Sequence, residues 1–272
     1  LNKELGEGQL PLDVDFDLVL SQNKFGQFQV AHPISRSLQL PLVSLEHTLP
    51  VPYWSEDVKF QTRHMRGDVN VFISNYSIND WQWESRNDTI VITHGVDSNL
   101  FYADNSIQKE NRILSVVNDW INRDWCCGFG IWQRVSSGLP IHVVGDTPGL
   151  SEAAKSTEDL VKEYQSSRIF LNTSTISPVP TALLEAMSCG CAVVTTSTCM
   201  IPEIVENGVN GFISNDEAEL KQYLVDLLND EDLAKKMGEA ARKTIVDNFS
   251  QENFVGNWDS LFQRAAKMCF RG

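Results

Sequence analysis

Short apolar runs recur along the chain and are separated by longer polar or amphipathic stretches. Such nearly continuous apolar runs are typical of strands that are buried on both faces of a parallel sheet. The intervals between the runs are long enough for crossover helices. The pattern therefore predicts an α/β protein with parallel sheets, whose strands lie at 17–20, 42–45, 69–73, 90–93, 113–117, 141–144, 169–172 and 192–195.

The last quarter of the chain has a helical period instead. One apolar stripe runs from Ala218 to Leu228, a second from Leu233 to Ile245, and a third from Phe254 to Ala265. Asn215 or Asp216 can cap the first of these helices, and Ser250 can cap the last one. The stripes predict three consecutive amphipathic helices.

The predicted division between two lobes lies near 94–97, where a strand ends and a glycine turn precedes a polar stretch. Strands lie on both sides of this point, so the chain is expected to fold as two Rossmann-like lobes with parallel sheets facing a cleft. Ligands of doubly wound sheets bind at the carboxyl ends of the strands. The cleft is therefore the expected place of the site.

Composition narrows the classes of partner. The net charge of −14 disfavours nonspecific binding to nucleic acid or to an anionic membrane. No apolar run has the length of a membrane span, and the N-terminus lacks the pattern of a secretory signal, so we expect a cytoplasmic protein with no membrane span.

The metal-binding residue types give no recognisable site. None of the cysteine spacings matches a zinc motif, and no Asp-x-Asp motif stands at a strand end in a suitable context. We expect no metal site and expect the six cysteines to be free thiols, namely Cys126, Cys127, Cys189, Cys191, Cys199 and Cys269.

The segment 169–196 carries the clearest candidate chemistry. A strand ends there, a loop with two prolines follows, and a helix is predicted from Thr181 to a left-handed cap at Gly190. The free N–H groups of Thr181, Ala182 and Leu183 would point out of the positive end of this helix. Such an end suits a pyrophosphate.

Glu185 lies one turn further along this apolar helix. A buried acid needs hydrogen-bond donors, and the paired hydroxyls of a ribose would supply them. Two structural alternatives remain from the residues alone: Glu185 caps a neighbouring loop, or it pairs with a lysine.

The stretch Leu184-Glu185-Ala186-Met187-Ser188-Cys189-Gly190 resembles the donor-binding signature of the group 1 glycosyltransferases, a retaining family with the GT-B fold. Three other segments resemble elements of the same family: 91–97 with Phe101, 201–212, and the tail 249–258. The likeness covers 90–265 well and 15–90 loosely.

The resemblance implies roles for individual residues. Glu185 would hold the ribose of the donor, while Ser177 stands where the family has a first glutamate that binds the transferred sugar. Arg123 is the candidate cation for the diphosphate, although the lysine that usually follows is absent. The alternative for Arg123 is a surface ion pair with Asp119 or Asp124. Gly145 resembles the family glycine that lets the nucleotide approach the backbone, and a plain turn is the alternative.

The resemblance also implies the division of labour between lobes. Residues 1–95 would form the acceptor-side lobe, and the helix 251–268 would pack back on it. Residues 96–250 would form the lobe that binds the nucleotide sugar. The family's first strand and glycine-rich loop have no counterpart, so the N-terminal lobe is expected to be small or truncated. His47, at a strand end, is a candidate for contacting sugar or phosphate, or else is structural.

Aromatic side chains could stack on sugar faces, although large aromatic residues more often lie in a core. The candidates are Trp81, Trp83, Trp120, Trp125 and Trp132.

The expected function is transfer of a sugar from a nucleotide diphosphate sugar to an acceptor hydroxyl, with retention and with no cofactor other than that donor. Two alternatives remain: a catalytically degenerate binding subunit, and a sugar-nucleotide epimerase of the same fold. The epimerase would need acid and base groups on both sides of the sugar, and the sequence offers no such set.

Overall fold

The first sheet of the computed structural model, which describes residues 15–268, is built from the N-terminal part of the chain. Its strands are parallel and pair in sequence order: β1 (Val19–Ser21), β2 (Leu42–Glu46), β3 (Val69–Phe72) and β4 (Thr89–Val91). The connections carry α1 (Phe28–Leu38), α2 (Glu56–Arg63) and α3 (Asn75–Asp80). This sheet contains the four strands predicted before residue 95.

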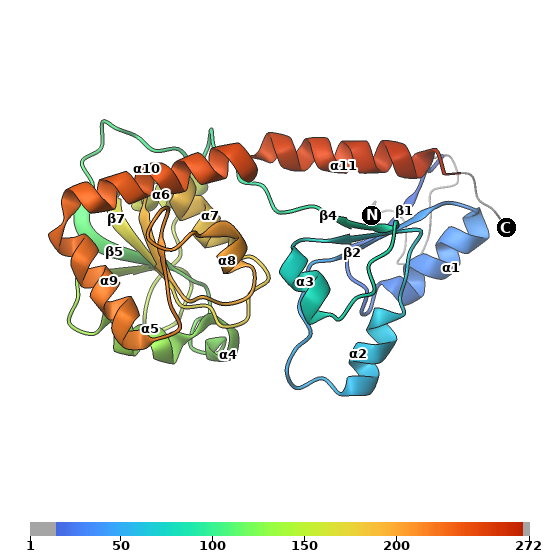
Figure 1. Cartoon of the computed structure of the whole chain (residues 1–272), viewed down its shortest axis with the longest axis horizontal. Helices are drawn as coiled ribbons and strands as arrows, with labels where there is room; N and C mark the ends of the chain where they lie inside the picture. Colours follow the sequence, from blue (N-terminus) through green and yellow to red (C-terminus); the bar gives the residue numbers. More distant parts are fainter. Residues whose placement is uncertain (1–14, 269–272) are drawn as a thin grey trace.

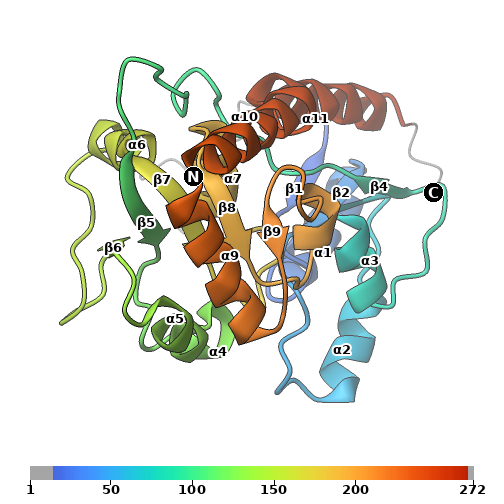
Figure 2. The same ribbon diagram turned by 60° about the vertical axis from the view of Figure 1, so that its left-hand side comes forward.

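The second sheet has five parallel strands in the order β6-β5-β7-β8-β9 (Figure 2). Four of them were predicted; the two-residue β9 was not, because so short a strand has no period of its own. Their bounds are β5 (Glu110–Val116), β6 (Ile141–Val144), β7 (Ser167–Asn172), β8 (Ala192–Thr195) and β9 (Phe212–Ile213). With parallel sheets in both lobes, the predicted α/β class with two parallel sheets is confirmed.

Helices cover both faces of the second sheet, which explains its unbroken apolar strands. Successive residues of a strand point to opposite faces: Phe170 packs in one cluster with Leu183 and Met187, while Ile169 packs in the other with Leu220 and Leu224. The helices are α4 (Asp124–Cys127), α5 (Phe129–Ser136), α6 (Thr157–Ser166), α7 (Thr181–Ser188), α8 (Ile201–Ile204), α9 (Glu217–Asn229) and α10 (Glu231–Asn248).

The three predicted C-terminal helices are present, and their caps are side chains that the sequence offered. Of the two candidates for α9, Asp216 is the cap, because its carboxylate accepts from the N–H groups of Ala218 and Glu219. The hydroxyl of Ser250 accepts from the N–H of Asn253 and starts α11 (Gln251–Ala266).

α11 leaves the second lobe and lies along the first sheet (Figure 1). Leu261 and Ala265 are buried there against Val43, Val69 and Val71. The C-terminal helix thereby supplies one face of the N-terminal core.

The two crossings between the lobes lie side by side. The N–H of Val96 donates to the carbonyl of Phe249 at 2.8 Å, and the N–H of Gln251 donates to Val96 at 3.0 Å. A Cβ at Gly95 would lie 2.7 Å from Cβ of Phe254 and 2.8 Å from the carbonyl oxygen of Ser250. The glycine of the predicted turn is therefore required for this close passage.

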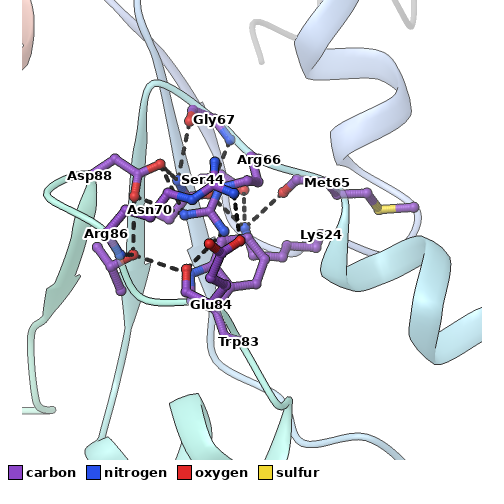
Figure 3. A network of polar contacts seen from close by, with 11 residues as sticks. Lys24, Ser44, Met65, Arg66, Gly67, Asn70, Trp83, Glu84, Arg86 and Asp88 are labelled. Atoms are coloured by element: carbon purple, nitrogen blue, oxygen red, sulfur yellow. Dashed lines mark hydrogen bonds and ion pairs between the residues drawn. The ribbon is translucent and has the colours of Figure 1, made fainter.

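A buried lysine holds the N-terminal lobe together (Figure 3). The ammonium of Lys24 donates to Oγ of Ser44 at 3.0 Å, to Oδ1 of Asn70 at 3.0 Å and to the carbonyl of Met65 at 2.9 Å. It also lies 4.4 Å from the ring centroid of Trp83. Burial lowers the pKa of Lys24 to about 7. One side chain thus joins the loop after β1 to β2 and β3.

Within residues 15–268, no helix is both long and apolar enough to cross a membrane.

Candidate functional site

The candidate donor site lies at the carboxyl ends of the strands of the second sheet. The loops after β5, β6, β7 and β8 leave this edge and carry Arg123, Gly145, Ser177 and Cys199 respectively. Parallel strands deliver all four loops to one edge, which is where ligands of such sheets bind.

The start of α7 provides donors for an anion. Its N-cap is Pro180, which has no side chain able to cap the helix. Among residues 15–268, the backbone N–H groups of Thr181 and Ala182 have no acceptor, whereas that of Leu183 already donates to the carbonyl of Pro180 at 3.0 Å. The prediction of three free N–H groups was therefore wrong by one, because the first turn tightens on Pro180. Two donors remain at the positive end of the helix.

Glu185 has a partner that the sequence did not reveal. The hydroxyl of Tyr164, in α6, donates to Oε2 of Glu185 at 2.8 Å. Burial raises the pKa of Glu185, and the hydrogen bond from Tyr164 opposes that rise. In the described part of the chain, the carboxylate neither pairs with a lysine nor caps a loop, so both structural alternatives were wrong. Oε1 is left for another donor.

Arg123 is exposed at the start of α4. Its Nη1 donates to the carbonyl of Asn118 at 3.3 Å. Asp119 instead accepts from Asn122, and Asp124 accepts from the N–H of Gly130. No carboxylate within residues 15–268 pairs with Arg123, so the alternative of a surface ion pair with Asp119 or Asp124 was wrong. The guanidinium faces solvent at the strand-end edge of the sheet.

Gly145 is required by the chain's own backbone. Its φ is +134°, and a Cβ there would lie 2.1 Å from the carbonyl oxygen of Val117. The loop after β5 thus passes directly over the end of β6. This contact accounts for a glycine without any nucleotide, and the approach of a nucleotide at Gly145 stays a prediction.

Ser177 lies half-buried in the loop before α7, next to a cluster that the sequence analysis missed. Its backbone hydrogen-bonds to the thiol of Cys199, which also contacts the hydroxyl of Tyr76 from the first lobe. Tyr76 in turn hydrogen-bonds to Asp80, and burial raises the pKa of Tyr76 to about 12. Cys199 has a φ of +50°, which is unusual for a residue with a side chain.

A second contact between the lobes lies beside this cluster. The carboxylate of Glu203, in α8, accepts from the N–H of Tyr76 at 2.6 Å and from that of Asn75 at 3.3 Å. These N–H groups belong to the first turn of α3, so an acid of one lobe caps a helix of the other. Glu203 stands in the segment 201–212 that the family resemblance singled out, which was the one available signal for it.

His47 follows β2 directly and is half-buried at the carboxyl edge of the first sheet. It lies near His94, which follows β4; burial lowers the pKa of His94, and the neighbouring His47 lowers it further. Two imidazoles therefore lie together at the carboxyl edge of the first sheet, where the sequence analysis expects a side chain that contacts sugar or phosphate.

The five candidate tryptophans separate into two groups. Trp81, Trp83, Trp120 and Trp132 are buried in the cores of the two lobes. Trp125, on α4, is 50% exposed. Only this one of the five can stack on a ligand without unpacking a core.

A separate hollow of about 540 Å³ lies at the opposite edge of the second sheet, between the segment 103–109 and α10. Two of its basic side chains serve the fold: Lys109 donates to the carbonyls of Ser167 and Cys189 at 3.2 Å each, and Arg242 donates to the carbonyl of Ser188. These bonds satisfy the carboxyl-terminal ends of α6 and α7. In residues 15–268, no three histidine, cysteine or acidic side chains gather as metal ligands would.

Residues 153–244 match the family model of the glycosyl transferases group 1. The segment that matches contains α7 and its surroundings. N-acetyl-alpha-D-glucosaminyl L-malate synthase of Bacillus anthracis is 33% identical over 82 residues, which are 29% of this chain and 22% of that enzyme. The chain thus spans less than a quarter of that relative in the alignment.

A longer alignment joins the chain to an uncharacterised glycosyltransferase of Methanocaldococcus jannaschii, with 24% identity over 88% of this chain and 73% of the relative. Among solved structures, Anabaena HepE in complex with UDP has a TM-score of 0.78 at 19% identity, covering 91% of this chain and 79% of that one. At this identity the likeness shows the two-lobed fold. With part of its C-terminal lobe matching the family model and both lobes matching the architecture, the chain is similar to the group 1 glycosyltransferases and has the GT-B fold.

Proposed function

We propose that the protein transfers a sugar from a nucleotide diphosphate sugar to an acceptor hydroxyl. The observation that carries this proposal is the start of α7, where the free N–H groups of Thr181 and Ala182 precede Glu185 by one helical turn. An anion site and a hydrogen-bond acceptor on one helix fit the diphosphate and the ribose of a single ligand. The fold shared with a protein that binds UDP supports a uridine nucleotide as the first donor to test.

Each group has a distinct task in this proposal. Oε1 of Glu185 accepts from the ribose while Tyr164 occupies Oε2. The α7 amides and the exposed guanidinium of Arg123 stabilise the negative charge that develops on the departing diphosphate. Ser177 contacts the transferred sugar, Gly145 lies near the nucleotide, and His47 faces the sugar from the first lobe.

The stereochemical and metal requirements follow the family resemblance. We propose transfer with retention of the anomeric configuration and without a metal ion, because the charge on the diphosphate is met by N–H groups and a guanidinium. Residues 96–250 would bind the donor, and residues 1–95 together with α11 would bind the acceptor. We also propose that the protein acts in the cytoplasm.

Ser177 favours one second candidate, a binding subunit without catalytic activity. A serine offers the sugar a single hydroxyl and no charge, where the family resemblance places a carboxylate. Such a protein would bind the nucleotide sugar and would neither transfer nor hydrolyse it.

Calorimetry with UDP and GDP tests the donor site. We expect micromolar to low millimolar affinity that is unaffected by EDTA. Arg123→Ala should weaken diphosphate binding at least tenfold and hardly change nucleoside binding, because charge-assisted hydrogen bonds contribute about 1.5–3 kcal/mol each. Equal losses for diphosphate and nucleoside would remove Arg123 from the site, and loss of binding with EDTA would contradict the metal-free proposal.

Ser177→Glu and Glu185→Ala test the two ends of the ligand. Ser177→Glu should change which nucleotide sugar is preferred and leave binding of UDP intact, since UDP carries no sugar beyond its diphosphate. Glu185→Ala should weaken UDP and UDP-sugars alike. Hydrolysis or transfer assays with a panel of nucleotide sugars then separate an enzyme from a binding subunit.

A further inference from the structure

Trp125 is the most exposed tryptophan of the protein. All seven tryptophans lie in the described residues, and Trp125 alone has half of its surface in water. Exposing so large an apolar ring forgoes stabilisation that burial would supply. The position therefore needs an explanation outside the packing of the second lobe.

A second exposed ring faces Trp125 from the other lobe. Tyr53, in the loop between β2 and α2, is 75% exposed, and its ring centroid lies 6.1 Å from that of Trp125 with an interplanar angle of 69°. This loop lies on the side of the first lobe that faces α4 (Figure 1). The two rings meet edge to face between the lobes. Most of the surface of Tyr53 and half of that of Trp125 remain exposed to solvent.

Backbone hydrogen bonds fix Trp125 beside the loop of Ser177. The carbonyl of Trp125 accepts from the hydroxyl of Thr175 at 3.1 Å. The carbonyl of Cys126 accepts from the N–H groups of Thr175 and Ile176 at 2.9 and 3.1 Å. α4 is thus attached to the loop one residue before Ser177, at the end of the donor site proposed for the transferred sugar.

The polar atoms of both rings are available to a ligand. Within residues 15–268, neither the indole N–H of Trp125 nor the hydroxyl of Tyr53 has a hydrogen-bond partner. The exposed segment around Trp125 also carries Asn122, Arg123 and Asp124. Apolar ring faces bordered by exposed polar groups match a pyranose, which has a C–H face and hydroxyls at its rim.

We propose that Trp125 and Tyr53 form the acceptor subsite and bind a pyranose ring of a saccharide acceptor. This inference rests on the proposed function, because it takes the Ser177 loop as the sugar end of the donor. The hydroxyl to be glycosylated would be carried by the pyranose, or by its neighbour, between the rings and the donor sugar. Since one ring comes from each lobe, the subsite depends on the relative position of the two lobes, which places the rings 6.1 Å apart here.

Fluorescence quenching by acrylamide tests the subsite without a known acceptor. The difference between the wild type and Trp125→Phe isolates the emission of Trp125. The probes are the methyl pyranosides of glucose, galactose, mannose and N-acetylglucosamine, each titrated with UDP present. We expect at least one of them to reduce quenching of Trp125 at least twofold, and Tyr53→Ala to weaken that pyranoside at least fivefold.

Controls separate this proposal from the proposed function. Tyr102→Ala removes another exposed ring, on the segment that links the lobes, and should leave pyranoside binding unchanged. Calorimetry with UDP on the same variants should show unchanged affinity. If UDP binds and no pyranoside protects Trp125, the acceptor subsite is wrong while the donor site stands.

Two further outcomes are decisive. Protection of Trp125 by neutral phosphatidylcholine vesicles and by none of the pyranosides would overturn the saccharide assignment in favour of an apolar partner. Failure of UDP to bind the wild type would count against the proposed function, whereas protection by a pyranoside would still support the aromatic subsite.

Discussion

The hydroxyl of Tyr164 donates a 2.8 Å hydrogen bond to Oε2 of Glu185. Burial raises the pKa of Glu185 above its ordinary value, and the hydrogen bond from Tyr164 lowers it in part. Ionising Glu185 therefore lowers the stability of the fold as pH rises through that pKa. In the proposed donor site, the same ionisation would make Glu185 a stronger acceptor for ribose hydroxyls.

Tyr164→Phe should raise the pKa of Glu185 further, because the substitution keeps the buried ring and removes the donor. If Glu185 holds the ribose, uridine affinity falls as the carboxylate is protonated, and in Tyr164→Phe this fall should begin at higher pH. Calorimetry with uridine from about pH 5 to about pH 8 measures the shift. Tyr223→Phe, whose ring stacks on Phe212, is the matched control. Identical profiles for wild type and Tyr164→Phe would separate Tyr164 from the ionisation of Glu185.

The sheets could be predicted because strands buried on both faces appear in the sequence as nearly continuous apolar runs. The run Ala192–Thr195 coincides with an observed strand, every residue of which is buried. Helix starts could also be predicted where a side chain caps the helix, as those of Asp216 and Ser250 do. These features depend on residues close together in the sequence.

The residues of the candidate site that could not be predicted make contacts with segments that are distant in the sequence. Tyr76 and Cys199 belong to different lobes, and no periodicity relates the loop after β8 to α3. Tyr164 has the same apolar helical position that a core residue would have, so its hydroxyl gave no signal. The family resemblance pointed to Glu185 and to the segment of Glu203, but not to either partner.

Gly145→Ala should destabilise the second lobe strongly. The added Cβ would lie 2.1 Å from the backbone carbonyl oxygen of Val117, and neither backbone can move aside cheaply. We expect a loss of about 2–4 kcal/mol in the free energy of unfolding, measured with urea. Gly149→Ala is the control: its φ of +81° is also left-handed, but nothing lies within 4 Å of the added Cβ, so the cost should be about 1 kcal/mol. Similar losses in both variants would mean that the loop after β5 yields readily.

Lys24 should make stability rise with pH. Its pKa is lowered from 10.5 to about 7 in the folded protein, chiefly by burial. Between these two values the unfolded chain binds more protons than the folded one, so the free energy of unfolding increases with pH, by at most about 1.4 kcal/mol per pH unit for one group.

Lys24→Met should remove this contribution and flatten the dependence, whatever its effect on stability at a single pH. Urea unfolding from about pH 7 to about pH 9.5 measures the slope. Lys162→Met replaces an exposed lysine of α6 and should keep the slope of the wild type. A wild-type slope that persists in Lys24→Met would show that other groups cause it.

Glu203→Gln should loosen the contact between the lobes at α3. The carboxylate binds two N–H groups at the positive end of this helix, at 2.6 and 3.3 Å, and its charge strengthens both bonds. Glutamine has one accepting oxygen and no charge, so it binds the two N–H groups more weakly and they open to solvent more often.

Hydrogen exchange of peptides that cover 73–80 measures this change directly. We expect several-fold faster exchange in Glu203→Gln, a modest effect because the contact is exposed to solvent and therefore screened. Glu206→Gln removes an exposed acid from the turn that follows α8 and should leave exchange in α3 unchanged. The same experiment with UDP-glucose present shows whether the contact matters for the donor: a ligand held between the lobes should slow exchange in the wild type more than in Glu203→Gln. Equal exchange of α3 in both variants and the wild type would mean that Glu203 does not hold the lobes together in solution.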